Sequence, residues 1–213
     1  MMFASHLRFT PLRAALIASI LTFSAGGVAS AESADKDAKQ PPKGDAAQEQ
    51  AMAEMMKYAM PGPMHDVLKP MAGNFNAAVK MWEGPGEPQA SQGSCQNTWI
   101  LGGRFLQCAY KGEFAGQPFE GFGLTGYDTM KRQYVGLWMD TMGTTVMISN
   151  GSAEAPGKAI TMNSSMDDPR TGKPMPIRSV TKIVDDNQHV YSMYTTQDGK
   201  ETLMMEITYT RAK

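Results

Sequence analysis

Alternating apolar and polar positions dominate the chain from residue 73 onward. Phe75, Ala77, Val79 and Met81 alternate with mostly polar neighbours, which is the period-two pattern of a half-buried strand. Nine further segments of this kind follow, at about residues 90–100, 104–111, 118–127, 133–140, 144–151, 159–165, 177–185, 189–196 and 201–211. Turn-forming sequences separate them and no helical pattern lies between them, so we expect an antiparallel meander.

Closure of this meander follows from its edges. An open sheet of about ten strands would leave two long unpaired edges, and closing the sheet removes both. We therefore predict an all-β fold over residues 73–213, an antiparallel, closed or nearly closed barrel of about ten strands.

A helical segment precedes the strands, over residues 45–72. Met52, Met55, Met56 and Met60 recur at helical spacing, and the sequence Pro61-Gly62-Pro63 ends this helix. A second, shorter helix is expected at about residues 64–71. We expect the helical segment to pack across one end or one side of the barrel.

The first 31 residues have the layout of a secretory signal peptide. Arg8 and Arg13 give a basic start, an apolar run covers residues 14–23, and small residues precede a cleavage site after Ala31. Residues 32–44 are polar and contain two prolines, which predicts a flexible linker. The expected location is a bacterial periplasm or the medium.

The charge and composition of the chain limit the classes of partner that can be expected. Removing the signal peptide leaves 18 of the 20 basic residues against 21 acidic ones, a net charge of −3. No polybasic segment remains, so a nucleic-acid partner is not expected. No apolar run reaches the ~18 residues of a membrane-spanning helix, so no stable membrane insertion is expected after cleavage.

The first tight hairpin places the two cysteines. If Gly102 and Gly103 form the turn, Cys95 faces Tyr110 and Cys108 faces Asn97. The cysteines then share one face, one step apart on the diagonal. An exported compartment permits a Cys95–Cys108 disulfide where the geometry is favourable, and the alternative is two small buried thiols.

Two further details bear on which side chains face inward. The turn Asp198-Gly199 predicts a final hairpin in which Val190, Tyr194, Leu203, Met205, Ile207 and Tyr209 form the inward face.

Three glycines, Gly121, Gly123 and Gly126, lie within one strand. Strand glycines mark bends or the close approach of a ligand, and in a small barrel we expect a bend.

Several ordered motifs carry a resemblance to a known family. They are His65-Asp-Val-Leu68, Met71-Ala-Gly-Asn-Phe75, Leu101-Gly-Gly-Arg-Phe-Leu106, Phe119-Glu-Gly-Phe-Gly123, Gly126-Tyr-Asp128, Trp138-Met-Asp140, Asp168-Pro-Arg-Thr-Gly172, Asp198-Gly-Lys-Glu201 and Met205-Glu-Ile-Thr-Tyr-Thr-Arg211. This set resembles the bacterial DUF1579 family over about residues 50–211. Phe75 stands where the family usually has Trp. The resemblance implies a lipocalin-like or calycin-like barrel and brings no activity, because the family is named for its unknown function.

A ligand-binding barrel is the leading functional hypothesis, because a barrel of this size can enclose one small apolar molecule. The candidate lining residues are Trp99, Tyr110, Tyr127, Trp138, Tyr194 and Tyr209. Tyr209 and Arg211 share a face of the last strand, and Arg offers a donor fork for a carboxylate. The alternative is that the aromatic side chains simply fill the barrel. No cofactor is expected.

Two other functions remain as alternatives. An enzyme would need Asp140 or Glu206 beside an inward Tyr or Arg, since no Ser-His-Asp, His-x-x-x-His or Cys-x-x-Cys arrangement is present. The methionines at 52–64 with His65 could instead bind copper(I) or a protein partner, although Met is also a common gap filler in cores.

Overall fold

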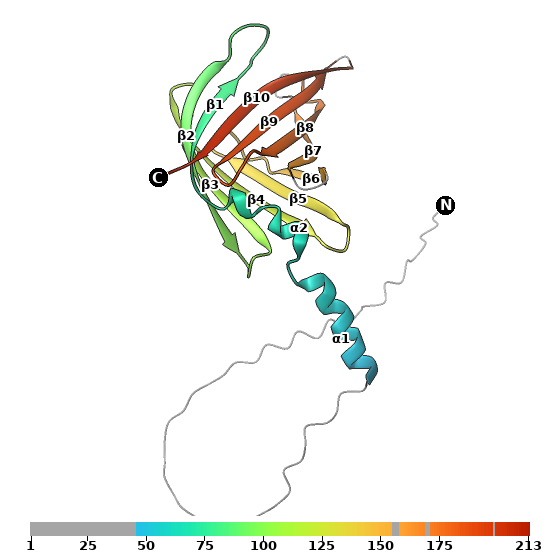
Figure 1. Ribbon diagram of the computed structural model, residues 1–213. Coiled ribbons are helices and arrows are strands. Elements are labelled where there is room, and N and C mark those ends of the chain that lie inside the picture. The colour runs from blue at the N-terminus through green and yellow to red at the C-terminus, as the bar shows by residue number, and fades with distance from the viewer. Residues whose placement is uncertain (1–45, 155–157, 169–170, 198) are drawn as a thin grey trace, which may run out of the picture. The chain divides into compact units, whose positions relative to one another are not determined.

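The computed structural model describes residues 46–154, 158–168, 171–197 and 199–213, and its strands form one closed barrel. The ten strands are β1 (Gly73–Met81), β2 (Gln89–Ile100), β3 (Phe105–Phe114), β4 (Gln117–Asp128), β5 (Gln133–Asp140), β6 (Met147–Glu154), β7 (Ala159–Asp167), β8 (Pro174–Ile183), β9 (Gln188–Gln197) and β10 (Lys200–Arg211) (Figure 1). Each strand pairs antiparallel with its neighbours in sequence. The predicted ten-stranded antiparallel barrel is confirmed.

Closure occurs between the first and last strands. β1 pairs with β2 through Phe75 and Cys95, and on its other side with β10 through Phe75 and Arg211. Along β1, exposed residues alternate with buried ones, so that Phe75, Ala77 and Val79 face the interior. This is the predicted period of two, and it gives the barrel an apolar inner face.

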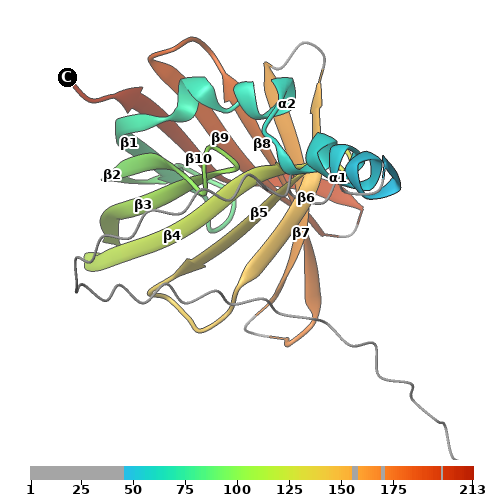
Figure 2. The ribbon, with the colours of Figure 1, turned by 90° about the horizontal axis from the view of Figure 1, so that it is seen from below.

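The helical segment consists of α1 (Ala46–Ala59), α2 (Pro63–Asp66) and the 3₁₀ turn η1 (Lys69–Met71). α2 and η1 lie across one end of the barrel (Figure 2). Residues 63–72 are called the plug below, and Leu68 at their centre is 0% exposed. The predicted packing of the helical segment therefore holds for α2 and η1 but not for α1, which has no buried residue.

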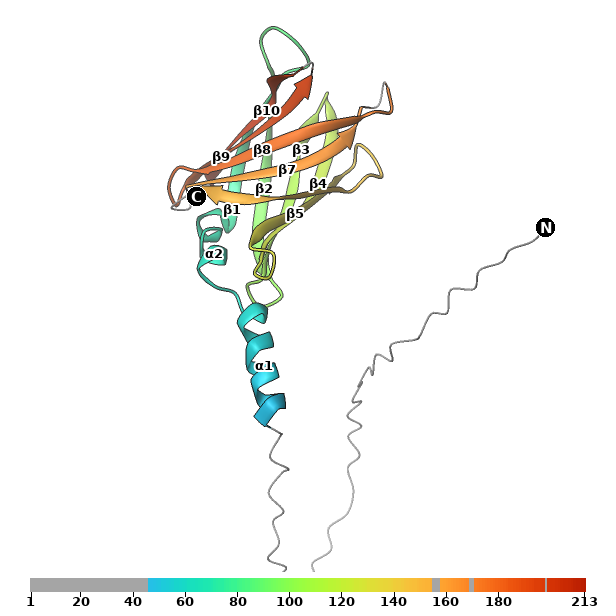
Figure 3. The ribbon, with the colours of Figure 1, turned by 90° about the vertical axis from the view of Figure 1, so that its right-hand side faces the viewer.

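The plug is fixed by packing and by hydrogen bonds to the wall. Leu68 packs in one cluster with Leu106, Tyr134, Ile160 and Met162. The Tyr134 hydroxyl donates to the Met64 carbonyl at 2.8 Å, and the Asn97 amide donates to the Met71 carbonyl at 2.7 Å. These bonds satisfy carbonyls that a short helix leaves without partners. The plugged end is consequently a packed core. No described helix covers the opposite end, which is called the open end below (Figure 3).

The predicted inward face of the last hairpin is correct for Met205, Ile207 and Tyr209 of β10 and wrong for Leu203 and for β9. Pairing starts as predicted, with Leu203 opposite Tyr194, but the register shifts before Met205, which lies opposite Met193. This β-bulge adds one residue to β10 and exchanges the two faces of β9 relative to it. Inward positions of β9 are therefore His189, Tyr191, Met193 and Thr195, while Val190 and Tyr194 face outward.

The strand glycines lie directly against aromatic rings, a role that the sequence pattern did not predict, and the expected bend stays a prediction. A Cβ at Gly121 would lie 2.3 Å from the indole of Trp138, and one at Gly123 would lie 3.0 Å from it. A Cβ at Gly126 would likewise lie 2.5 Å from the ring of Phe105. These glycines let a neighbouring ring lie flat against the backbone.

Candidate ligand-binding lumen

Most inward side chains toward the open end keep part of their surface accessible, whereas the centre of the plugged end is fully buried. The packed cluster around Leu68 contains Tyr134 at 0% and Ile160 at 2% exposure. Toward the open end, Ile177 and Thr195 are buried, but nine inward side chains fall into the intermediate exposure class. They are Met81, Phe119, Trp138, Met147, Met166, Met175, Tyr191, Met193 and Met205. We call the space they border the lumen, and its lining consists of thioether and aromatic groups.

The polar groups deeper in the barrel are neutral at physiological pH. Burial raises the pKa of Tyr110, of Tyr191 and of Tyr209 above the ordinary tyrosine value. The hydrogen bond with the Cys108 thiol, together with burial, raises the pKa of Cys95. These three phenols and the Cys95 thiol therefore stay protonated and present no charge to a ligand.

Asp140 and Glu206, the carboxylates considered for catalysis, are both engaged in structural contacts. Asp140 shares the inner face with Trp138, as predicted, but its Oδ2 accepts from the Trp138 indole at 2.8 Å and its Oδ1 from the Met142 amide at 2.9 Å. Glu206 lies on the outer face of β10, 3.8 Å from Lys80. Neither carboxylate is beside an inward Tyr or Arg, as the enzyme hypothesis required.

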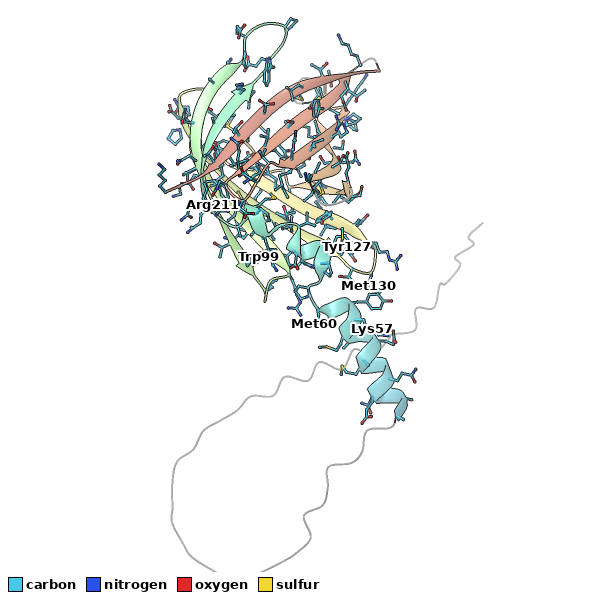
Figure 4. All side chains as sticks on the ribbon, viewed as in Figure 1. Lys57, Met60, Trp99, Tyr127, Met130 and Arg211 are labelled. Atoms are coloured by element: carbon cyan, nitrogen blue, oxygen red, sulfur yellow. The ribbon has the colours of Figure 1, made fainter. Side chains whose placement is uncertain are left out.

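The six candidate aromatic residues are divided among three places. Trp99 and Tyr127 pack against the plug cluster, around the end that α2 covers (Figure 4). Tyr110, Trp138 and Tyr209 belong to a second cluster on the inner wall. Tyr194 lies outside the barrel, where the Arg178 guanidinium stacks on its ring at 4.4 Å. Only the second group can border a ligand in the lumen.

Arg211 is not free to bind a carboxylate. Its Nη1 donates to the Ala72 carbonyl at 2.8 Å, and its Nη2 donates to the Pro70 carbonyl at 2.9 Å. The Asp186 carbonyl accepts from both Nε and Nη2. The guanidinium also covers the ring of Phe75 at 4.7 Å. Arg211 therefore anchors the plug to the last strand, and the predicted Tyr209–Arg211 anion site is wrong.

The cysteines occupy the predicted register. Cys95 lies opposite Tyr110 and Cys108 opposite Asn97. The two are free thiols on one inner face, and the Cys95 Sγ lies 3.0 Å from Asn97 Oδ1. The disulfide is not formed in this structure. Whether oxidation closes it stays a prediction.

His65 is buried, whereas the methionines of α1 proposed to join it in a copper site are exposed. It is 5% exposed, and its Nδ1 accepts a hydrogen bond from the Gly62 amide at 3.1 Å. Burial lowers the pKa of His65, so the ring is a neutral cap for α2. The methionines of α1 are exposed instead, with Met55 at 57%. Among the described residues there is no group of three His, Cys, Asp or Glu side chains placed to hold a metal. Partner binding by the methionines of α1 stays a prediction.

The lumen residues Tyr191 and Met193 were missed because the predicted register turned β9 around. The alternation along β9 was visible in the sequence, but the bulge that decides which set faces inward has no glycine or turn residue to mark it. Only tyrosine and tryptophan were selected from the sequence as candidate lining residues. Phe119, Met147, Met166 and Met175 were therefore missed.

A hollow lies on the outer side of the wall. It has a volume of about 430 Å³ and is bordered by the outward residues Ala109, Phe122 and Met139 and by the β5–β6 loop. Lys111 and Glu120, which lie 3.4 Å apart, add an ion pair to its border. We call it the outer groove.

Comparisons with known proteins place the chain in a family and a fold. A family model described as a protein of unknown function (DUF1579) matches residues 60–211. No curated protein sequence matches the chain. The crystal structure of Rv2717c from M. tuberculosis has a TM-score of 0.54 and 16% identity, covering 71% of this chain and 99% of that one. The S-type phycobiliprotein lyase CPES from Guillardia theta has a TM-score of 0.49 and 10% identity, covering 75% and 97%.

The likeness to Rv2717c concerns the fold alone, and it agrees with the barrel described above. No helix in the described part of the chain is long and apolar enough to cross a membrane. The family match includes the plug and all ten strands. On that evidence, this chain belongs to the DUF1579 family.

Proposed function

We propose that this protein binds a small, uncharged and largely apolar molecule in the lumen. The observation that carries the proposal is the difference between the two ends of the barrel. At the plugged end the residues around Leu68 are fully buried, and toward the open end the inward thioether and aromatic groups remain partly accessible. Covering accessible apolar surface inside a barrel with a ligand removes that surface from water, which stabilises the complex.

The absence of a free charge on the described inner wall defines the ligand class. Arg211 is saturated by backbone carbonyls, and Asp140 accepts two hydrogen bonds from its own strand and loop. An anionic ligand would lose its hydration without gaining a partner, which is costly. A neutral molecule with one or two polar atoms fits the phenol and thiol groups of the deeper wall.

Titration with the neutral fluorophore N-phenyl-1-naphthylamine tests the proposal. Ser91 lies on the inner face of β2 opposite Val79, and the adjacent Gln92 points outward. Replacing Ser91 with Phe should fill the lumen, so Gln92→Phe serves as the matched control. We expect saturable binding of one fluorophore per chain in wild type and Gln92→Phe, with energy transfer from tryptophan. Equal binding by Ser91→Phe would contradict the proposal.

We further propose that the chain is exported to the periplasm or beyond the cell. The support is the basic start, apolar run and small-residue site in residues 1–31, which lie outside the described residues. Expression of the full chain in a bacterium followed by cell fractionation tests this. A mature chain beginning at Glu32 in the periplasmic fraction is expected, and a cytoplasmic chain retaining residues 1–31 would contradict it.

A further inference from the structure

Three methionines stand side by side on the inner wall, on the neighbouring strands β1, β10 and β9. Met81 lies opposite Met205, and Met205 lies opposite Met193. Residues directly opposite each other on one face of antiparallel strands have Cβ atoms about 4.5–5.5 Å apart. We call these three residues the methionine triad.

The β-bulge in β10 creates this triad. With the register of the turn continued, Met193 would lie opposite Met204, and Met81 would still lie opposite Met205. The two methionine pairs would then occupy opposite faces of β10. The extra residue makes Met205 the partner of both Met81 and Met193, which aligns all three side chains on the inner face.

The surroundings of the triad are accessible and uncharged. All three methionines are partly exposed, and Met81 is the last residue of β1, at the open end. The charged residues beside them in sequence, Lys80 and Glu206, point outward and lie 3.8 Å from each other. Met162, by contrast, is 8% exposed and packed within the plug cluster, as expected of a methionine that only fills a core.

We propose that the methionine triad binds one soft monovalent metal ion, Cu(I), through its three thioether sulfurs. Thioethers are neutral, polarisable ligands that favour Cu(I), whereas carboxylate and carbonyl oxygens are preferred by Mg²⁺ and Ca²⁺. A methionine side chain has three rotatable bonds, so sulfurs from three adjacent strands can converge on one ion. The site lies at the rim of the lumen and is independent of whether the lumen holds an apolar ligand.

Silver(I) is the probe for the first experiment, because it is a soft monovalent ion that resists oxidation. Full-length protein labelled with ¹³C at the methionine methyl groups is titrated with Ag⁺, and native mass spectrometry gives the stoichiometry. We expect one ion per chain and shifts of the Met81, Met193 and Met205 methyl signals. These signals are assigned with single Met→Leu variants. Shifts confined to other methionines, or no binding at all, would overturn the proposal.

Variants distinguish the methionine triad from other sulfur atoms in this chain. Replacing Met81, Met193 and Met205 with Leu is nearly volume-conserving and should weaken Ag⁺ and Cu(I) binding by about 10–100-fold or more. The matched control replaces the same number of exposed methionines on α1, at positions 52, 55 and 56, and should leave binding unchanged. Loss of binding only in this control would overturn the proposal.

The two cysteines require their own control, because thiols also bind soft metals. The double variant Cys95→Ser, Cys108→Ser should keep the triad methyl shifts, and disappearance of those shifts would assign the ion to the thiols and overturn the proposal. Met205→Leu alone provides a less disruptive test if the triple variant folds poorly. Titration of the wild-type protein with N-phenyl-1-naphthylamine in the absence of metal measures the ligand site by itself, so failure of the metal site and failure of the ligand site are distinguishable.

Discussion

The contact between Gly121 and Trp138 allows a quantitative test of how the lumen wall is built. A Cβ placed at Gly121 would lie 2.3 Å from Cζ2 and 2.5 Å from Cη2 of the indole, which is far inside van der Waals contact. The ring is rigid, so it must rotate away. Rotation also strains the hydrogen bond from its Nε1 to Asp140 Oδ2, which is 2.8 Å long.

The expected cost of Gly121→Ala follows from three terms. Overpacking a core costs about 1–3 kcal/mol, and a strained hydrogen bond to a charged group adds about 1–2 kcal/mol. Replacing a strand glycine with Ala returns about 0.5–1 kcal/mol of backbone entropy. The free energy of unfolding should therefore fall by about 2–4 kcal/mol, which a protein of ordinary stability survives at 25 °C.

Urea denaturation followed by tryptophan fluorescence measures this change. Gly123→Ala, with its nearest ring atom at 3.0 Å, should cost less, and Gly84→Ala, with nothing within 4 Å, should be neutral or slightly stabilising. In a double-mutant cycle, Trp138→Leu should relieve most of the cost of Gly121→Ala. Equal effects at all three glycines, or strict additivity in the cycle, would refute the steric account of this wall.

Three further predictions concern buried polar groups. Burial, with a smaller effect of nearby Arg211, lowers the pKa of His189 from 6.5 to about 4. As the pH falls, the histidine of the unfolded chain is therefore protonated before that of the folded chain. The free energy of unfolding should fall by roughly 3 kcal/mol from pH 6.5 to pH 4. His189→Phe, which also removes an unpaired Nδ1, should lose that part of the pH dependence, and urea titrations showing the same slope in both proteins would contradict this. Arg211→Met should lower the free energy of unfolding by about 2–4 kcal/mol by releasing the plug, and Arg211→Lys should not restore it, since an ammonium lacks the planar fork; full stability of the Lys variant in thermal unfolding would argue against the anchor. In the folded, reduced protein, Cys95 should resist alkylation at pH 8 until urea is added, because its raised pKa disfavours the thiolate; rapid labelling in peptide mapping would show that the thiol is not held as described.

Much of the fold could be predicted because its information is local. Alternation within β1 and the turn at residues 101–104 were sufficient to give the strand, the hairpin and the register that pairs Cys95 with Tyr110. Barrel closure followed from the number of strands and the cost of free edges. These inferences depend on residues near each other in sequence.

The errors came from features that have no local signal. The bulge before Met205 depends on how β10 fits two neighbours at once, and no glycine marks it. Arg211 finds its partners in the plug, with Ala72 lying 139 positions away, so its strand position alone suggested a ligand site. The helical spacing of Met52, Met55 and Met56 predicted a packed face, yet these side chains are exposed.

A crystal structure of the complex with N-phenyl-1-naphthylamine tests the ligand-binding lumen most directly. In the described part of the chain, the lumen, the outer groove and the exposed methionines of α1 are apolar surfaces that could hold the fluorophore. We predict that its rings lie inside the barrel, in contact with Trp138, Tyr191 and Met205. Density only in the outer groove or on α1, with these three side chains packed against one another, would contradict the account.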